Sequence, residues 1–156
     1  MIVGEAPERN FTTVMENIDN ILQQYRSLRL SEVIDYDKFN DFAITHHSTG
    51  IEGSTLTATE TRLLLDEGLT PKGKPLIHSL MVRDHYEALR FVITSADHKK
   101  PISTELIQQI NAHVMRQTGT QYHTVLGTVD SSKGAFRKGN VSAGGSYFPS
   151  YQKVED

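Results

Sequence analysis

The sequence contains no cysteine, and this absence excludes several kinds of chemistry. It rules out a disulfide framework, a thiolate metal site and a cysteine nucleophile, while leaving the cellular compartment open. No G-x-S-x-G motif marks a nucleophilic serine, although serine, histidine and aspartate all occur. We therefore assign no hydrolase chemistry to this chain.

Long apolar runs are also missing. The first ten residues, MIVGEAPERN, lack the apolar core of a signal peptide, and no later run reaches the roughly 18 apolar residues of a membrane span. The formal net charge is -3 with both signs interspersed, so there is no basic field of the kind that attracts nucleic acid or membrane surfaces. These features predict a soluble, cytoplasmic protein that binds neither nucleic acid nor membrane.

The composition is that of a globular domain. With 156 residues, 37% of them hydrophobic and 22% charged, the chain is long enough to bury one core. It shows no repeat, no low-complexity tract and no convincing linker. We expect a single domain over 1–156, with the N-terminal helices in 1–56 and the remainder in 57–156.

Apolar residues recur at steps of three and four over most of the first three quarters of the chain, which is the pattern of amphipathic helices. The predicted helices cover 11–28, 31–52, 57–67, 77–92 and 103–114, and Gly68 closes the third of them. Beyond Gly119, closely spaced glycines separate short segments and favour a small hairpin. The predicted fold class is therefore mainly α with a small β-hairpin.

Two local signals fix the region around residue 52. Gly53 can adopt the left-handed conformation that a helix C-terminal cap needs, so Glu52 is expected at the end of the second helix. Thr57 and Glu60 have the spacing of a capping box, which predicts that a new helix begins there. Two helix ends should thus meet close to Glu52.

Other apparent motifs have simpler interpretations. Gly68 to Lys74 fits the first seven positions of a phosphate-binding P-loop, but Pro75 stands where the motif needs a hydroxyl and a backbone N–H. An ordinary turn is the better interpretation. His46 and His47 are adjacent and have no ligand-type residue one helical turn away, so a metal site is not predicted there.

Four stretches of the chain resemble the Fic family. STGIEGSTLTATETR (48–62) is similar to its inhibitory-helix signature, [S/T]-x-x-x-E-[G/N], and to the helix start that follows. The stretches HSLMVRDHYEALRFVI (78–93) and PISTELIQQINAHVM (101–115) resemble the next two helices of the family. VLGTVDSSKGAFRKGNVSAGGSYF (125–148) resembles its flap, where a G-x-[F/Y]-R turn leads into a β-hairpin. The resemblance implies a Fic-like helical domain of the class with an N-terminal inhibitory helix.

The resemblance also implies roles for particular residues. Ser48 and Gly53 match the hydroxyl and small-residue positions of the signature, and Glu52 matches the inhibitory glutamate, which pairs with an arginine that would otherwise clamp the γ-phosphate of ATP. Flap positions implied to contact the nucleotide, together with Glu52, are Val141, Ser142, Ala143 and Gly144. Phe136 and Arg137 match the turn that enters the flap and docks the target protein.

The activity implied is transfer of AMP from ATP to a hydroxyl side chain of a target protein, with Mg²⁺ as the metal ion. In some family members the same glutamate instead helps to remove AMP, so the direction of the chemistry stays open. The family's catalytic loop, H-P-F-x-[D/E]-G-N-G-R, occurs nowhere in this sequence. We therefore expect a chain truncated before that loop and inactive alone, because a missing general base typically removes about 10²–10⁴ in rate.

Two hypotheses follow. The first is a self-inhibited adenylyltransferase whose catalytic loop, with its magnesium ligand, lies outside this sequence; its oligomeric state stays open, with a homo-oligomer among the alternatives. The second is a non-catalytic helical module that inhibits a partner by presenting Glu52 to an arginine of another chain. Finding or not finding the histidine loop in the coding sequence after Asp156 separates them.

Overall fold

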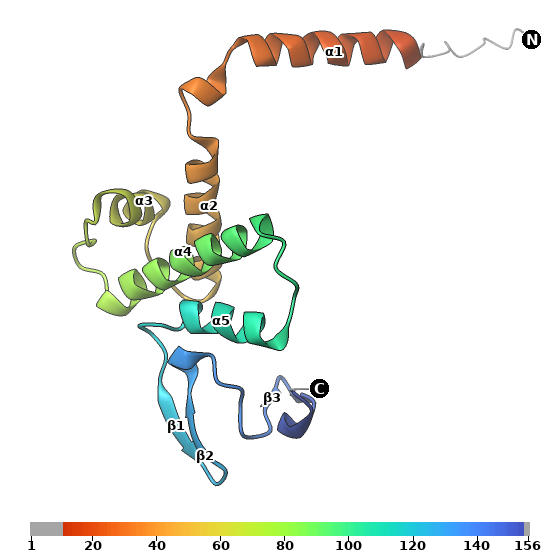
Figure 1. Cartoon of the computed structure of the whole chain (residues 1–156). Helices are drawn as coiled ribbons and strands as arrows, with labels where there is room; N and C mark the ends of the chain where they lie inside the picture. The colour runs from red at the N-terminus through yellow and green to blue at the C-terminus, as the bar shows by residue number, and fades with distance from the viewer. Residues whose placement is uncertain (1–10, 155–156) are drawn as a thin grey trace, which may run out of the picture. The chain divides into compact units, whose positions relative to one another are not determined.

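The computed structural model describes residues 11–154, with the side chains of 11–16 and 31 excepted. The chain divides into two compact units, Met1–Lys38 and Phe39–Asp156. The α-helices, labelled in Figure 1, are α1 Phe11–Ser27, α2 Tyr36–Ile51, α3 Ala58–Glu67, α4 Leu76–Asp97 and α5 Thr104–Val114. The short 3-10 turns are η1 Leu30–Glu32, η2 Ser131–Lys133 and η3 Tyr151–Lys153. The strands are β1 Gln121–Thr124, β2 Gly127–Asp130, β3 Ser142–Ala143 and β4 Ser146–Tyr147.

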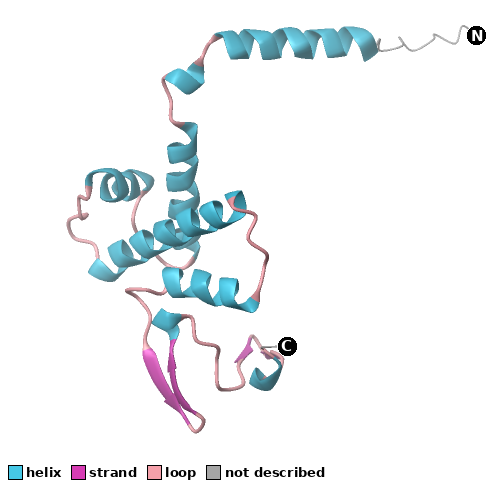
Figure 2. Cartoon of the chain, viewed as in Figure 1, coloured by secondary structure: helices cyan, strands magenta, loops and turns pink. Residues whose placement is uncertain are grey.

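Helices dominate the described chain, and the strands are confined to its last part (Figure 2). The strands form two separate antiparallel pairs, β1 with β2 and β3 with β4. This confirms the predicted fold class, mainly α with a small antiparallel β-hairpin, and it is consistent with a Fic-like helical domain. Within residues 11–154, no helix combines the length and the apolarity that a bilayer crossing requires.

In the first unit, the chain turns between α1 and α2. Arg29 adopts the left-handed conformation with φ 48°, which ends the helical path before η1. The Asp35 carboxylate then accepts a 2.9 Å hydrogen bond from the Lys38 backbone N–H and caps the start of α2. The second helix therefore begins at Tyr36, five residues later than the sequence pattern predicts.

The core of the second unit forms where α3, α4 and the segment before α3 meet. Its buried apolar side chains include Leu56, Leu64 and Val82, of which Val82 has no exposed surface. An unusual share of the buried residues is polar: Asp41, Thr45, Thr49, Thr61, Ser79, Asp84 and Ser95. Of these, Asp41, Thr61 and Asp84 hydrogen-bond to another element, whereas the hydroxyls of Thr45, Ser79 and Ser95 have no hydrogen-bond partner within the described residues. Because a buried polar group without a partner costs free energy, the three paired groups favour the observed meeting of these elements.

The first hairpin is paired along its whole length. Gln121 faces Asp130, Tyr122 faces Val129, and the two-residue turn Val125–Leu126 closes the pair. The Asp130 carboxylate accepts hydrogen bonds from the Gln121 amide at 2.9 Å and from the Ser132 backbone N–H at 3.0 Å. Hydrogen bonding, first from the Ser132 hydroxyl and then from Gln121, holds the pKa of Asp130 below its usual value. The carboxylate thus links the hairpin to η2.

Two glycines allow the backbone after α5 to lie directly against that helix. A Cβ on Gly119 would stand 2.6 Å from the Met115 carbonyl oxygen, and one on Gly134 would stand 2.0 Å from the Gln108 carbonyl oxygen. Gly134 also has a φ of +68°, where a side chain is strained. No other residue type fits there, and this glycine sets where the second hairpin leaves the helices.

Replacing Gly134 by alanine should therefore lower the free energy of unfolding by roughly 2–4 kcal/mol, since positive φ and a backbone clash add together. Gly139→Ala is the matched control, because nothing lies within 4 Å of its Cβ position and its φ is not positive. Chemical denaturation of the two variants provides the measurement. If the Gly134→Ala and Gly139→Ala variants had the same free energy of unfolding, the close contact of the Gly134 backbone with the Gln108 carbonyl would not constrain the fold.

Candidate functional site

The end of α2 is a Schellman motif. The Ser54 backbone N–H donates to the Thr49 carbonyl at 2.9 Å, and the Gly53 N–H donates to the Gly50 carbonyl at 3.1 Å. Gly53 takes a φ of +97°, with open space around its Cβ position. The helix ends at Ile51, so the prediction that residues 48–52 are helical is confirmed up to Ile51, and Glu52 lies one residue beyond the helix, followed by Gly53.

Glu52 occupies the cap position between the last helical residue and Gly53. It is exposed, and its backbone N–H donates to the carbonyl of the half-buried Ser48 at 3.3 Å. The negative charge of Glu52 affects the pKa of His85, which lies on α4. Burial lowers the pKa of His85, and the negative charge of Glu52 partly offsets that effect. The carboxylate forms no ion pair with an arginine within residues 11–154.

The segment after Gly53 is held by α3 and α4. The Thr55 hydroxyl lies 3.0 Å from Nδ1 of His78, and the Lys74 ammonium donates to the Thr55 carbonyl at 2.8 Å. Thr57 and Glu60 form the predicted capping box, with both reciprocal hydrogen bonds present. Lys74 also lies 3.8 Å from Glu60, so the lysine of the P-loop-like stretch stabilises this junction.

Side-chain contacts hold α2 against α3 and α4. The Arg90 guanidinium lies 2.8 Å from the buried Asp41 carboxylate, and the Phe42 and Tyr86 rings have centroids 5.7 Å apart. On the α3 side, Nδ1 of His46 lies 3.5 Å from the Thr61 hydroxyl. Within residues 11–154, no group of three or more ligand-type side chains could hold a metal ion.

The second hairpin, β3–β4, contains the residues of the predicted flap. Gly144 and Gly145 have φ values of 56° and 81°, the conformation of the tight two-residue turns that join antiparallel strands. Ser142 faces Tyr147 across the pair, and the segment from Val141 to Gly144 is exposed. The structure thus leaves this backbone open to a ligand.

The half-buried Arg137 closes the base of this hairpin, and the half-buried Phe136 precedes it. The Arg137 guanidinium donates to the Gly139 carbonyl at 2.9 Å and to the Pro149 carbonyl at 2.5 Å. It therefore joins the chain before β3 to the chain after β4. These contacts show that Arg137 holds the hairpin together. The family resemblance separately implies that Arg137 helps to dock the target protein.

No hydrogen bond or ion pair within the described part of the chain joins Ser48, Glu52 or Gly53 to the flap residues. The connection runs through α4. Asp84, next to His85 and 1% exposed, accepts hydrogen bonds from the Gln117 backbone N–H at 2.6 Å and from its side-chain amide at 2.7 Å. Gln117 lies in the turn that leads from α5 to the first hairpin, so α4 contacts the chain before the first hairpin rather than the flap itself.

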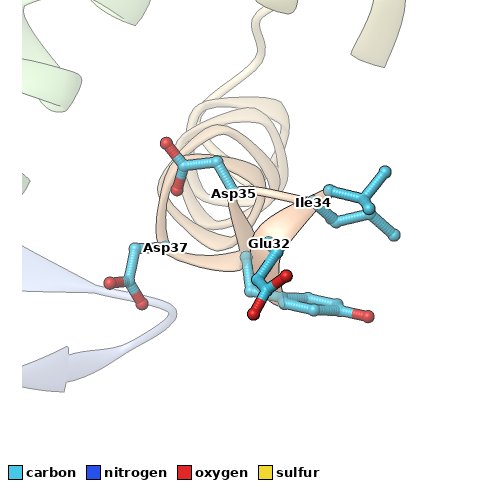
Figure 3. A pocket seen from close by; sticks show the side chains of 6 residues that line it. Glu32, Ile34, Asp35 and Asp37 are labelled. Carbon is cyan, nitrogen blue, oxygen red and sulfur yellow. The ribbon is translucent and has the colours of Figure 1, made fainter. Parts of the chain in front are cut away.

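A separate hollow lies in the first unit, where the chain passes from η1 to α2 (Figure 3). It is lined by six consecutive residues, 32–37. The carboxylates of Glu32, Asp35 and Asp37 point in different directions in Figure 3. Glu32 pairs with Arg29 at 3.6 Å, and Asp35 caps α2, so these groups have structural partners rather than a shared ligand.

Sequence reasoning missed His85 and Asp84. One signal was available for the histidine: His78 and His85 are seven residues apart, which places them on the same face of α4 two turns apart. His78 contacts Thr55, and the charge of Glu52 affects the pKa of His85. This face of α4 therefore lies beside the end of α2. No local signal marks the contact of Asp84 with a residue 33 positions later.

The comparison with known proteins agrees with these features. Protein adenylyltransferase Fic of Drosophila melanogaster, of Drosophila simulans and of Drosophila sechellia are each 31% identical to this chain over 105 residues. That segment is 67% of this chain but 19% of each relative, so the match spans about a fifth of their length. No protein-family model matches the chain. The similarity supports a relationship to the Fic family.

Glu52→Gln should lower the pKa of His85 further, because it removes the negative charge that offsets the effect of burial. Since a lowered histidine pKa makes the folded state resist protonation, the variant should also lose more stability as the pH falls below the ordinary histidine pKa. An NMR titration of His85 measures the shift. Glu87→Gln, at an exposed position on another face of α4, is the control; equal shifts in both variants would disprove the specific Glu52–His85 interaction.

Arg137→Lys should loosen the flap hairpin, because a single ammonium cannot reproduce two guanidinium bonds to separate carbonyls. We expect the Phe148 amide, which donates to the Val141 carbonyl, to exchange its hydrogen roughly tenfold faster or more. Hydrogen exchange followed by NMR provides the test, with Lys153→Gln as the control. If the Phe148 amide exchanged its hydrogen at the wild-type rate in Arg137→Lys, the two Arg137 hydrogen bonds would not be holding the hairpin.

Proposed function

We propose that this chain is the inhibitory-helix and flap portion of a Fic-type protein adenylyltransferase, with Glu52 as the residue that restrains activity. The observation that carries the proposal is the position of Glu52, at a Schellman cap that exposes its side chain. The similarity to relatives named protein adenylyltransferase supports the activity at the level of the family. The class with an N-terminal inhibitory helix is proposed on the STGIEG signature.

The electrostatics at residue 52 suit a guanidinium. The C-terminal end of a helix has a partial negative charge, and the carboxylate of Glu52 adds a full one. An arginine that approached this point would gain from both charges and could bind the carboxylate through two parallel hydrogen bonds. The arginine would then be unable to hold the γ-phosphate of ATP, and ATP would bind without reacting.

The proposed reaction transfers AMP from ATP to a hydroxyl side chain of a target protein. The hydroxyl oxygen attacks the α-phosphorus, its proton passes to the histidine of the catalytic loop, and diphosphate leaves. The residues of this chain hold the nucleotide and the target: Val141 to Gly144 present exposed backbone to the nucleotide, and the Phe136–Arg137 turn orients the hairpin.

Magnesium would offset the phosphate charge in this reaction. The residues described in 11–154 do not fit such an ion, because no group of three or more His, Asp or Glu side chains could hold one. We therefore propose that the magnesium ligand and the histidine come from the catalytic loop, outside these 156 residues. A target protein, ATP and a cytoplasmic location complete the proposal.

A second function is favoured by one observation. The Glu52 carboxylate is exposed and has no arginine partner within the described residues. It could therefore receive an arginine of another chain, which would make this protein a non-catalytic inhibitor. Breaking a buried pair of that kind typically costs about 3–5 kcal/mol, so Glu52→Ala should abolish such a complex.

The test of the first proposal uses the complete product of the gene, including whatever the coding sequence encodes after Asp156. With α-labelled ATP and Mg²⁺, Glu52→Gly should increase the transfer of AMP to protein on the order of 10²-fold, because an interaction with the transferring phosphates is restored. The 156-residue chain alone should transfer none. Finding the histidine loop in the coding sequence is the first expected result.

The chain offers a matched control in Glu67→Gly. Glu67 is also an exposed glutamate at a helix end followed by a left-handed glycine, Gly68 with a φ of +72°. This variant should leave AMP transfer unchanged. If the loop is present and both variants label equally, the inhibitory role of Glu52 is wrong; if no loop is present and nothing is labelled, the catalytic proposal fails in favour of the inhibitor.

A further inference from the structure

Thr55, three residues after Glu52, is held by the start of α4. Its backbone N–H donates to Nδ1 of the half-buried His78 at 3.3 Å, and its hydroxyl lies 3.0 Å from the same nitrogen. Its carbonyl accepts the hydrogen bond from Lys74 described above. The backbone just after Gly53 is therefore fixed by another helix as well as by the local turn.

The contact with Thr55 requires a hydrogen-bond acceptor at position 78. A backbone N–H can only donate, so Nδ1 of His78 accepts and the neutral ring carries its proton on Nε2. Within residues 11–154, the Thr55 N–H has no other hydrogen-bond acceptor. Because Thr55 is exposed, water can replace the acceptor if the histidine is removed. Loss of His78 should therefore loosen this segment without unfolding the chain.

The histidine acts at the end of α2 that leads to Glu52. Near the other end of the helix, Asp41 is paired with Arg90 in the second half of α4. Arg90 and His78 are 12 residues apart, about 18 Å along the axis of α4, so the two contacts hold separate points. A change at His78 therefore acts on the segment beside Glu52 and leaves the Asp41–Arg90 pair in place.

We propose that His78 is a positioning residue for the restraint of AMP transfer by Glu52. By accepting the Thr55 N–H, His78 fixes the chain that follows α2, so that the Glu52 carboxylate stays where an arginine can meet it. This inference rests on the proposed function, in which Glu52 restrains activity. Removing the acceptor should weaken the restraint and raise AMP transfer, by less than the removal of Glu52 itself does.

AMP transfer by the complete gene product, with α-labelled ATP and Mg²⁺, tests this role. His78→Leu removes the acceptor and should raise transfer about three- to tenfold, the worth of one hydrogen bond. His78→Asn should restore the wild-type rate, because its amide oxygen lies as many bonds from the backbone as Nδ1 does. His98→Leu changes an exposed histidine at the far end of α4 and should have no effect.

Thr55→Val approaches the same contact from the other side. It removes the hydroxyl beside Nδ1, keeps the shape of the side chain, and should raise transfer in the same direction as His78→Leu. This variant keeps the test independent of any effect that a leucine at position 78 has on folding. If neither variant raises transfer although Glu52→Gly does, the role of His78 is wrong and the proposed function stands.

A double variant shows whether His78 acts through Glu52. In the Glu52→Gly background, His78→Leu should add no further increase, because no carboxylate is left to position. If it raises transfer there by the same factor as in the wild type, or if His78→Asn behaves like His78→Leu, the positioning role is overturned. If Glu52→Gly itself leaves transfer unchanged, the proposed function and this inference fail together.

Discussion

The left-handed conformation of Gly53 is the constraint on which the arrangement around Glu52 depends. It lets the Ser54 N–H return to the Thr49 carbonyl, so α2 stops within one residue and the chain turns toward α3. The same turn leaves the Glu52 side chain exposed at the negative end of the helix. A residue other than glycine at position 53 would strain this turn, and the carboxylate would lose its fixed position.

Helix α4 is the element that connects the separate parts of the candidate site. His78 and His85 lie beside the end of α2. Asp84, next to His85, accepts two hydrogen bonds from Gln117 in the turn after α5. From that turn the chain passes into the first hairpin, through Gly134 and on to the flap. A shift of α4 would therefore act on the surroundings of Glu52 and on the turn that precedes the first hairpin. Within the described residues, no hydrogen bond or ion pair joins the region of Glu52 directly to the flap.

The parts of this fold that local chemistry determines could be predicted from the sequence. Gly53 and the Thr57–Glu60 capping box act over a few residues, and both are present as expected. Helix limits were less predictable: Asp35 delays the start of α2, and α4 continues to Asp97, five residues past the predicted end. The turn Val125–Leu126 carries none of the usual turn residues, so the first hairpin had no clear local signal.

Long-range partners were beyond sequence reasoning. The pairing of Asp84 with Gln117 and the bridge from Arg137 to Pro149 depend on how helices and hairpins meet, which periodicity does not encode. Sequence similarity suggested a docking role for Arg137, and the contacts add a role in holding the hairpin.

The central claim is that Glu52 is held at the end of α2 to receive a guanidinium. An experimental structure of the complete gene product without nucleotide tests it most directly, through the distance from the Glu52 carboxylate to the nearest arginine. The account predicts an arginine of the catalytic loop within salt-bridge distance, about 4 Å or less. A Glu52 carboxylate that faces solvent in that structure, with the loop arginines bound elsewhere, would contradict it.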